Sequence, residues 1–110
     1  GIAISSGNSF VHETESQVIL NGSYNINFTM DLVKKDMSLF NELSKKINTP
    51  LEISPFVLEI FKDAQKKYGS RAWSSMVVKR LEDKFGLSFR APNFPSELID
   101  NEKEEKGYEI

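Results

Sequence analysis

Apolar residues recur at helical spacing along the chain, and residues that begin or end helices separate the stretches. The clearest stretch spans residues 30–47, where the apolar side chains fill roughly one half of a wheel drawn at about 100° per residue. We expect this helix to begin near Phe28 or Thr29 and to end at Ile47, because Asn48 suits a left-handed cap and Pro50 prevents continuation. Its apolar residues are Met30, Leu32, Val33, Met37, Leu39, Phe40, Leu43 and Ile47.

Two more helices are expected, one on each side of this stretch. The earlier helix is short, is capped by Asn8 or Ser9, and ends at Asn21-Gly22. The later helix starts at Ser54-Pro55, an N-cap followed by proline at the first helical position, and it stops at Gly69. These boundaries follow from local chemistry, since each residue type satisfies or removes a free backbone group at a helix end.

A fourth helix is expected from about Trp73 to Phe85, with Gly86 as its stop. No stretch alternates polar and apolar residues, so the sequence predicts no sheet. The fold class is therefore all-α, a compact bundle of about four to five helices over residues 1–96, followed by an acidic tail over residues 97–110. On the fourth helix we expect the buried residues to be Trp73, Val77, Leu81 and Phe85.

Composition narrows the possible chemistry. The chain has 110 residues, enough for one domain, and it contains no cysteine and one histidine. Thiolate catalysis and a cysteine metal site therefore cannot be built, a Ser-His-Asp triad or a histidine-based metal site is not expected, and we expect no metal. No apolar run approaches the roughly 20 residues that span a bilayer, and no secretory signal is visible. We expect a cytoplasmic protein without a membrane partner.

The net charge of −2 is unevenly distributed. Residues 97–110 carry six acidic and two basic side chains, and the basic residues of the preceding part form no stripe. Nucleic-acid binding is therefore not expected. The acidic tail is expected to be solvated, with Tyr108 and Ile110 as candidate anchors on a partner subunit.

Asp36 stands out because it projects near the centre of the apolar arc of residues 30–47, with Lys35 just outside its edge. A carboxylate buried there must be paired, hydrogen-bonded or facing a wet cleft, since an unpaired one would cost several kcal/mol. Together with Phe28 at the helix entrance, Lys35 and Asp36 are candidates to hold an anionic substrate and the polar face of a cofactor. The alternative is an ion pair between Asp36 and a neighbouring helix, with Phe28 as a hydrophobic staple.

The motif Phe28-x6-Lys35-Asp36 resembles the second, helical domain of the β-hydroxyacid dehydrogenases. This family includes 3-hydroxyisobutyrate dehydrogenase and is related to 6-phosphogluconate dehydrogenase, whose C-terminal domain has the expected fold. The resemblance covers further segments in the same order along the chain. These are Ser6-Gly7-Asn8-Ser9, Asn48-Thr49-Pro50, Tyr68-Gly69, Ser75-Met76-Val77-Val78 and Leu81-Glu82.

The resemblance implies roles for the three candidates. Lys35 would contact NAD or NADP near the nicotinamide, Asp36 would support catalysis by organising the active site, and Phe28 would bind substrate as a wall of its pocket. The family's general acid/base lysine lies upstream, in a Gly-x-x-x-Lys-x-x-Asn-type motif that this chain lacks. Its dinucleotide-binding Gly-x-Gly-x-x-Gly pattern is missing as well. Relatives also commonly have aspartate where this chain has Ala72-Trp73.

We therefore expect a C-terminal piece of an NAD(P)-dependent oxidoreductase that acts on a small β-hydroxy acid or semialdehyde. The piece would supply part of the substrate and nicotinamide cleft and of the subunit interface, and it would be inactive alone. Its expected partners are its own N-terminal Rossmann domain, the small hydroxy-acid or aldehyde substrate, and a second copy in a homodimer. The alternative is a non-enzymatic helical module whose groove binds a partner helix.

Overall fold

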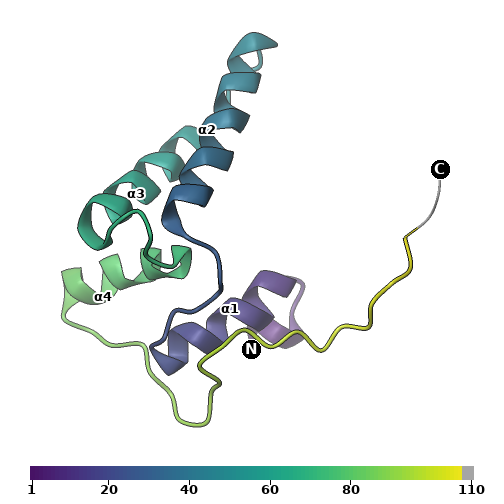
Figure 1. Cartoon of the computed structure of the whole chain (residues 1–110), viewed down its shortest axis with the longest axis vertical. Helices are drawn as coiled ribbons and strands as arrows, with labels where there is room; N and C mark the ends of the chain where they lie inside the picture. Colours follow the sequence, from purple (N-terminus) through teal and green to yellow (C-terminus); the bar gives the residue numbers. More distant parts are fainter. Residues whose placement is uncertain (108–110) are drawn as a thin grey trace.

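The protein is all-α in the computed structural model, which describes residues 1–107 (Figure 1). Within these residues the only β pairing is an isolated bridge between Thr29 and Trp73. The expectations of a helical fold without a sheet are thereby confirmed. The elements, in chain order, are η1 (Ile2–Ile4), α1 (Phe10–Asn21), α2 (Met30–Lys46), α3 (Ile53–Tyr68), η2 (Ser74–Val78) and α4 (Lys79–Phe85).

Helices α2 and α3 form an antiparallel hairpin that projects from the rest of the molecule, while α1 lies beside its base (Figure 1). The short η2 contacts α1, α3 and α4, so it is the hub that joins the hairpin to the other helices. The residues with the most deeply buried apolar side chains come from α1, the following loop, α2 and α3. They are Val18, Tyr24, Met30, Leu58 and Ala64.

The ends of α1 and α2 follow the expected local chemistry. The hydroxyl oxygen of Ser9 accepts a hydrogen bond from the backbone N–H of His12 at 3.0 Å, which caps α1. Gly22 ends the same helix in the left-handed region, with φ at 90°. Asn48 also adopts a positive φ, 53°, just beyond α2. These three assignments are confirmed.

The start of α3 differs from the expectation. The helix begins at Ile53 and follows Glu52, whose side chain makes no capping bond. Ser54 therefore lies inside the first turn, and its hydroxyl donates instead to the side-chain oxygen of Asn41 on α2, at 2.7 Å. The predicted Ser54 cap is wrong because the hairpin offers Ser54 a partner on the neighbouring helix.

The predicted fourth helix is also different, because it is divided into η2 and α4. A 3₁₀ helix has about three residues per turn, so apolar residues spaced for an α-helix no longer lie on one side of the segment. As a result, the expected burial of Leu81 and Phe85 is wrong, since these side chains are 48% and 61% exposed. Ser74, Ser75 and Glu82 are buried in this region instead.

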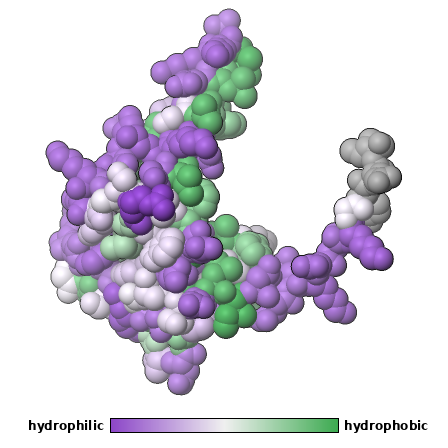
Figure 2. Space-filling view, viewed as in Figure 1, coloured by the Kyte–Doolittle hydropathy of each residue, from purple (hydrophilic) through white to green (hydrophobic). Residues whose placement is uncertain are grey.

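One long face of the hairpin is apolar and exposed. A hydrophobic band follows the projecting part of α2 in the space-filling view (Figure 2). The hairpin is two helices thick, so α3 covers one side of α2, and among residues 1–107 no helix packs along the opposite side of its projecting part. The exposed apolar residues of this face, which we call the outer face, are Leu32, Leu39, Phe40 and Leu43 on α2, Ile47 directly after it, and Ile53 and Phe56 on α3.

The segment after α4 contains no helix or strand up to residue 107, as the sequence predicted. Its first half is tied to the end of α1, because Asn21 donates to the carbonyl of Phe94 at 3.0 Å and Ser23 donates to that of Ser96 at 2.7 Å. The later part then leaves the helices (Figure 1). The candidate anchors Tyr108 and Ile110 lie outside the described residues. None of the helices within residues 1–107 has both the length and the apolar character needed to cross a membrane.

Candidate functional site

Backbone contacts hold the segment before α2 against the start of η2. The N–H of Ser74 donates to the carbonyl of Phe28 at 2.8 Å, and the N–H of Met30 donates to the carbonyl of Ala72, also at 2.8 Å. The Phe28 side chain keeps 37% of its surface exposed and lines two cavities of about 560 and 420 Å³. Phe28 is therefore placed where a small molecule can contact its ring.

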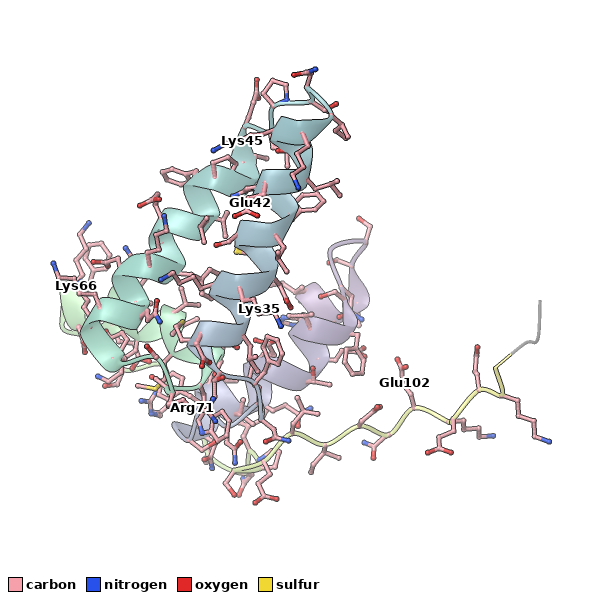
Figure 3. The ribbon with its side chains drawn as sticks, turned by 45° about the horizontal axis from the view of Figure 1, so that its top comes forward. Lys35, Glu42, Lys45, Lys66, Arg71 and Glu102 are labelled. Atoms are coloured by element: carbon pink, nitrogen blue, oxygen red, sulfur yellow. The ribbon has the colours of Figure 1, made fainter. Side chains whose placement is uncertain are left out.

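Lys35 and Asp36 lie further along α2, and both are exposed. Neither residue lines the two cavities that contain Phe28. Lys35 and Glu42 lie along one side of α2 in the stick view (Figure 3). The structure thus keeps Lys35 beside Asp36 on one helix, but it does not bring these two residues and Phe28 into a single cavity.

Asp36 lies on the outer face, between Leu32 one turn earlier and Phe40 one turn later. The expectation of a buried carboxylate is wrong, because other elements cover only one part of the apolar half of α2 and leave the other part exposed to solvent. Met30, Val33 and Met37 lie on the better covered part, while Leu32 and Phe40 remain exposed. No hydrogen bond or ion pair joins Asp36 to another residue within 1–107, so the alternative of an ion pair with a neighbouring helix is also wrong.

The best-developed polar cluster is one that sequence reasoning missed. Glu82 on α4 is 4% exposed, and its carboxylate accepts the hydroxyl of Tyr24 and the guanidinium of Arg90, the latter at 3.2 Å. Arg90 also donates to the Tyr24 hydroxyl at 3.0 Å. Burial alone would raise the pKa of Glu82, but the hydrogen bonds from Tyr24 and Arg90 outweigh it and hold the pKa below its ordinary value.

The carboxylate of Glu82 is buried, Arg90 is partly exposed, and the two charges are paired, so we interpret the cluster as a structural ion pair that holds segments of the fold together. It joins the loop after α1, α4 and the start of the irregular C-terminal segment. Ser75 strengthens the same region by donating to the carbonyl of Tyr24 at 2.5 Å. Tyr24 and Arg90 lie 58 and 8 residues from Glu82 in the sequence, so no short sequence motif indicates that the three residues form a cluster.

The sequence model of the family described as "NAD-binding of NADP-dependent 3-hydroxyisobutyrate dehydrogenase" matches residues 2–81. The chain belongs to this family. The resemblance to the C-terminal domain of the β-hydroxyacid dehydrogenases is thereby confirmed. No curated protein and no solved structure is significantly similar to the chain.

The range matched by the family model includes some of the candidate residues and not others. Phe28, Lys35 and Asp36 lie inside the matched range, whereas Glu82 and Arg90 lie beyond its end at residue 81. The outer face of α2 is therefore a property of the family-matched part of the chain. Arg90, which pairs with Glu82, belongs to the segment that follows the matched range.

Proposed function

We propose that this chain is the helical domain of an NAD(P)-dependent oxidoreductase that acts on a small β-hydroxy acid or semialdehyde. In that enzyme it supplies one wall of the cleft for substrate and nicotinamide, and part of the subunit interface. The carrying observation is that Asp36 lies on the uncovered apolar face of α2 and that the adjacent Lys35 lies at the edge of this face, both exposed and both within the family-matched range.

An apolar helix face of this length is unfavourable in water and usually marks a surface that another domain or subunit covers. A dinucleotide-binding domain packed there would exclude water around Asp36 and Lys35. Both charges would then interact more strongly with a bound ligand, because the effective dielectric constant falls when a site closes. In this proposal the carboxylate of Asp36, which is exposed in the separate chain, becomes covered only when the dinucleotide-binding domain packs on this face.

The residues present fit a nicotinamide cofactor in chemical type. Lys35 supplies an ammonium donor that makes no hydrogen bond or ion pair within residues 1–107, and Leu32 and Leu39, one turn before and after it, supply apolar surface. In this proposal Lys35 donates to the cofactor near its nicotinamide, Asp36 accepts a hydrogen bond that fixes the geometry of the site, and Phe28 limits the substrate pocket. The cofactor, when bound, supplies hydride transfer.

We assign the general acid/base to none of Phe28, Lys35 and Asp36, because the resemblance to the β-hydroxyacid dehydrogenases gives that role to a lysine outside the matched segments. A lysine from outside the chain would hold and move the proton at the substrate oxygen. We therefore propose that the chain alone does not turn over substrate. Its contribution is orientation, which lowers the barrier by holding reacting groups in place.

The test is NADPH binding by the enzyme in which this domain is joined to its dinucleotide-binding half. Replacing Lys35 by alanine is expected to raise the dissociation constant about tenfold or more, the typical effect of losing a hydrogen bond to a charged group. Lys45→Ala is the matched control, because Lys45 is exposed near the other end of the same helix (Figure 3). Equal dissociation constants for wild type and Lys35→Ala would rule out the assigned role.

The far end of the outer face supports a second copy of the chain as a partner. Ile53 and Phe56 are 76% and 68% exposed at the start of α3, and a groove of about 500 Å³ runs between the two helices beside them. An exposed ring next to a groove permits reciprocal packing about a twofold axis. Phe56→Asp should shift the sedimentation of the protein towards the monomer, whereas Lys66→Asp, an exposed change elsewhere on α3, should not.

A non-enzymatic interaction module is the second candidate, and the same groove favours it, since Met37, Phe40 and Val57 could accept the apolar side of a partner helix. The coding sequence ahead of residue 1 separates the two candidates. A βαβ unit with a Gly-x-Gly-x-x-Gly fingerprint supports the enzyme, and a polar linker supports the module.

A further inference from the structure

The smaller of the two Phe28 cavities contains a carboxylate that the proposed function does not use. This cavity has a volume of about 420 Å³ and lies where α1, α2, α3 and η2 meet. Its lining is mostly apolar and includes Phe10, Val33, Phe61 and Val77. A mostly apolar cavity with a few inward polar groups is the usual form of a small-molecule site.

Glu15 on α1 is the charged member of this lining. It is half-buried, and it makes no hydrogen bond or ion pair with any residue in the range 1–107. The neighbouring hydroxyl of Thr14 is already engaged, since it donates to the carbonyl of Phe10 at 2.8 Å. Glu15 therefore presents acceptor oxygens that no group of the described chain satisfies.

No basic side chain lines the cavity to compensate this charge. Burial without a partner raises the pKa of Glu15 above its ordinary value, which is the response of a carboxylate that lacks a nearby cation. A ligand that brings its own positive charge would relieve this cost, whereas a carboxylate ligand would add repulsion. The electrostatics of the cavity thus select against an acid such as the substrate of the proposed enzyme.

The cavity is also open enough to be entered. Phe10, Val11 and Leu98 line it and keep 46%, 57% and 37% of their surfaces exposed. These residues come from the exposed edge of α1 and from the C-terminal segment beside it. A ligand can therefore reach Glu15 without unfolding a helix.

We propose that this cavity binds a small organic amine, with its ammonium group paired to the carboxylate of Glu15 and its apolar body against Phe10 and Phe61. The hydroxyl of Ser74 lines the same cavity and is available as an additional acceptor. This site goes beyond the dehydrogenase proposal, because neither the nucleotide nor the hydroxy acid takes part. The binding needs only the chain described here, so its test is independent of NADPH binding.

Phenethylamine is the probe, with phenethyl alcohol and phenylpropionate as neutral and anionic comparisons of similar size. Calorimetric titration of the whole chain is expected to show about tenfold tighter binding of the amine than of the alcohol, as for a hydrogen bond to a charged group, and no binding of the carboxylate. In methyl NMR spectra of the wild-type chain, the amine should shift the signals of Val33 and Val77. The signal of Leu43, on the outer face, should stay in place.

Glu15→Gln keeps the shape of the side chain and removes its charge. We expect it to weaken amine binding about tenfold, while binding of the alcohol stays nearly unchanged. Glu13→Gln is the matched control, because it removes the same charge from α1 at a residue outside this cavity and should leave amine binding intact. Failure of the amine to bind, equal loss in both variants, or shifts at Leu43 rather than at Val33 and Val77 would each overturn the proposal.

Discussion

Arg90 occupies the space that a side chain at position 22 would fill. A Cβ atom added to Gly22 would lie 2.5 Å from Nε of Arg90, closer than any real contact. Arg90 cannot simply move away, because it donates to the carbonyls of Ile19 and Phe89 and to the carboxylate of Glu82. Gly22 therefore meets two needs, the left-handed end of α1 and room for the guanidinium.

Replacement of Gly22 by alanine should lower the free energy of unfolding by roughly 2 kcal/mol, from the strained φ and the displaced Arg90 together. Gly86→Ala is the matched control, since Gly86 also has a left-handed φ, 63°, but has no neighbouring atom within 4 Å of an added Cβ. It should cost only about 1 kcal/mol. Urea unfolding of both variants tests the difference, and equal decreases in the free energy of unfolding would show that the Arg90 side chain can move aside at no cost.

Loss of Arg90 should destabilise the chain more than loss of a surface arginine. Arg90→Ala leaves the buried carboxylate of Glu82 without its cation, and we expect a loss of about 2 kcal/mol, moderated by the partial exposure of Arg90. Arg71→Ala breaks an ion pair to Asp31 whose arginine side chain is 80% exposed, so it should cost at most about 1 kcal/mol. Chemical denaturation measures the free energy of unfolding of both variants, and similar decreases would contradict a stabilising role for the Arg90–Glu82 pair.

The pKa of Glu82 predicts a specific response to acid. Its folded pKa lies below the ordinary value of 4.5, despite burial, because Tyr24 and Arg90 bond to the ionised form. The stabilisation is therefore complete above the unfolded pKa and is lost as pH falls through the lowered folded pKa. Glu82→Gln should be less stable than wild type near neutral pH, and the gap should narrow below about pH 4.5. A constant gap across urea titrations at these pH values would refute this assignment.

Asp36 should matter for turnover and not for folding. Its side chain is exposed and unpaired within residues 1–107, so Asp36→Ala should change the free energy of unfolding by less than about 0.5 kcal/mol. In the enzyme that joins this domain to its dinucleotide-binding half, the same change is expected to abolish turnover. Glu42→Ala, at an exposed position further along α2, serves as the control and should keep both stability and kcat. Normal kinetics in the Asp36 variant would remove it from the site.

Local chemistry explains which helix boundaries could be predicted. Ser9 caps α1, Gly22 and Gly86 end helices in the left-handed region, and Asn48 follows α2 with a positive φ. Each of these residues acts on backbone groups a few positions away, so its effect is visible in the sequence. Ser54 failed as a predicted cap because its hydroxyl bonds to a residue of another helix.

The candidate site could be predicted only in part. The family match includes Phe28, Lys35 and Asp36, yet their grouping in one cleft does not follow from it, because the structure places Phe28 at cavities that the other two do not line. The sequence did not indicate the burial of Glu15 or Glu82, although Leu81-Glu82 is one of the segments of the family resemblance, since a charged residue on a helix is usually solvated. Their environments depend on Phe61, Arg90 and other residues that the fold brings from distant segments.

The sequence by itself determined the all-α class, most of the helix ends and the family. Hydrophobic periodicity and capping act within a few residues and therefore survive in the linear order of the chain. Only the tertiary structure decided which apolar side of α2 is covered, that η2 replaces the first part of the fourth helix, and that Glu82 is enclosed. Burial is set by neighbouring elements, and an amphipathic helix records that it has an apolar side without recording what packs against it.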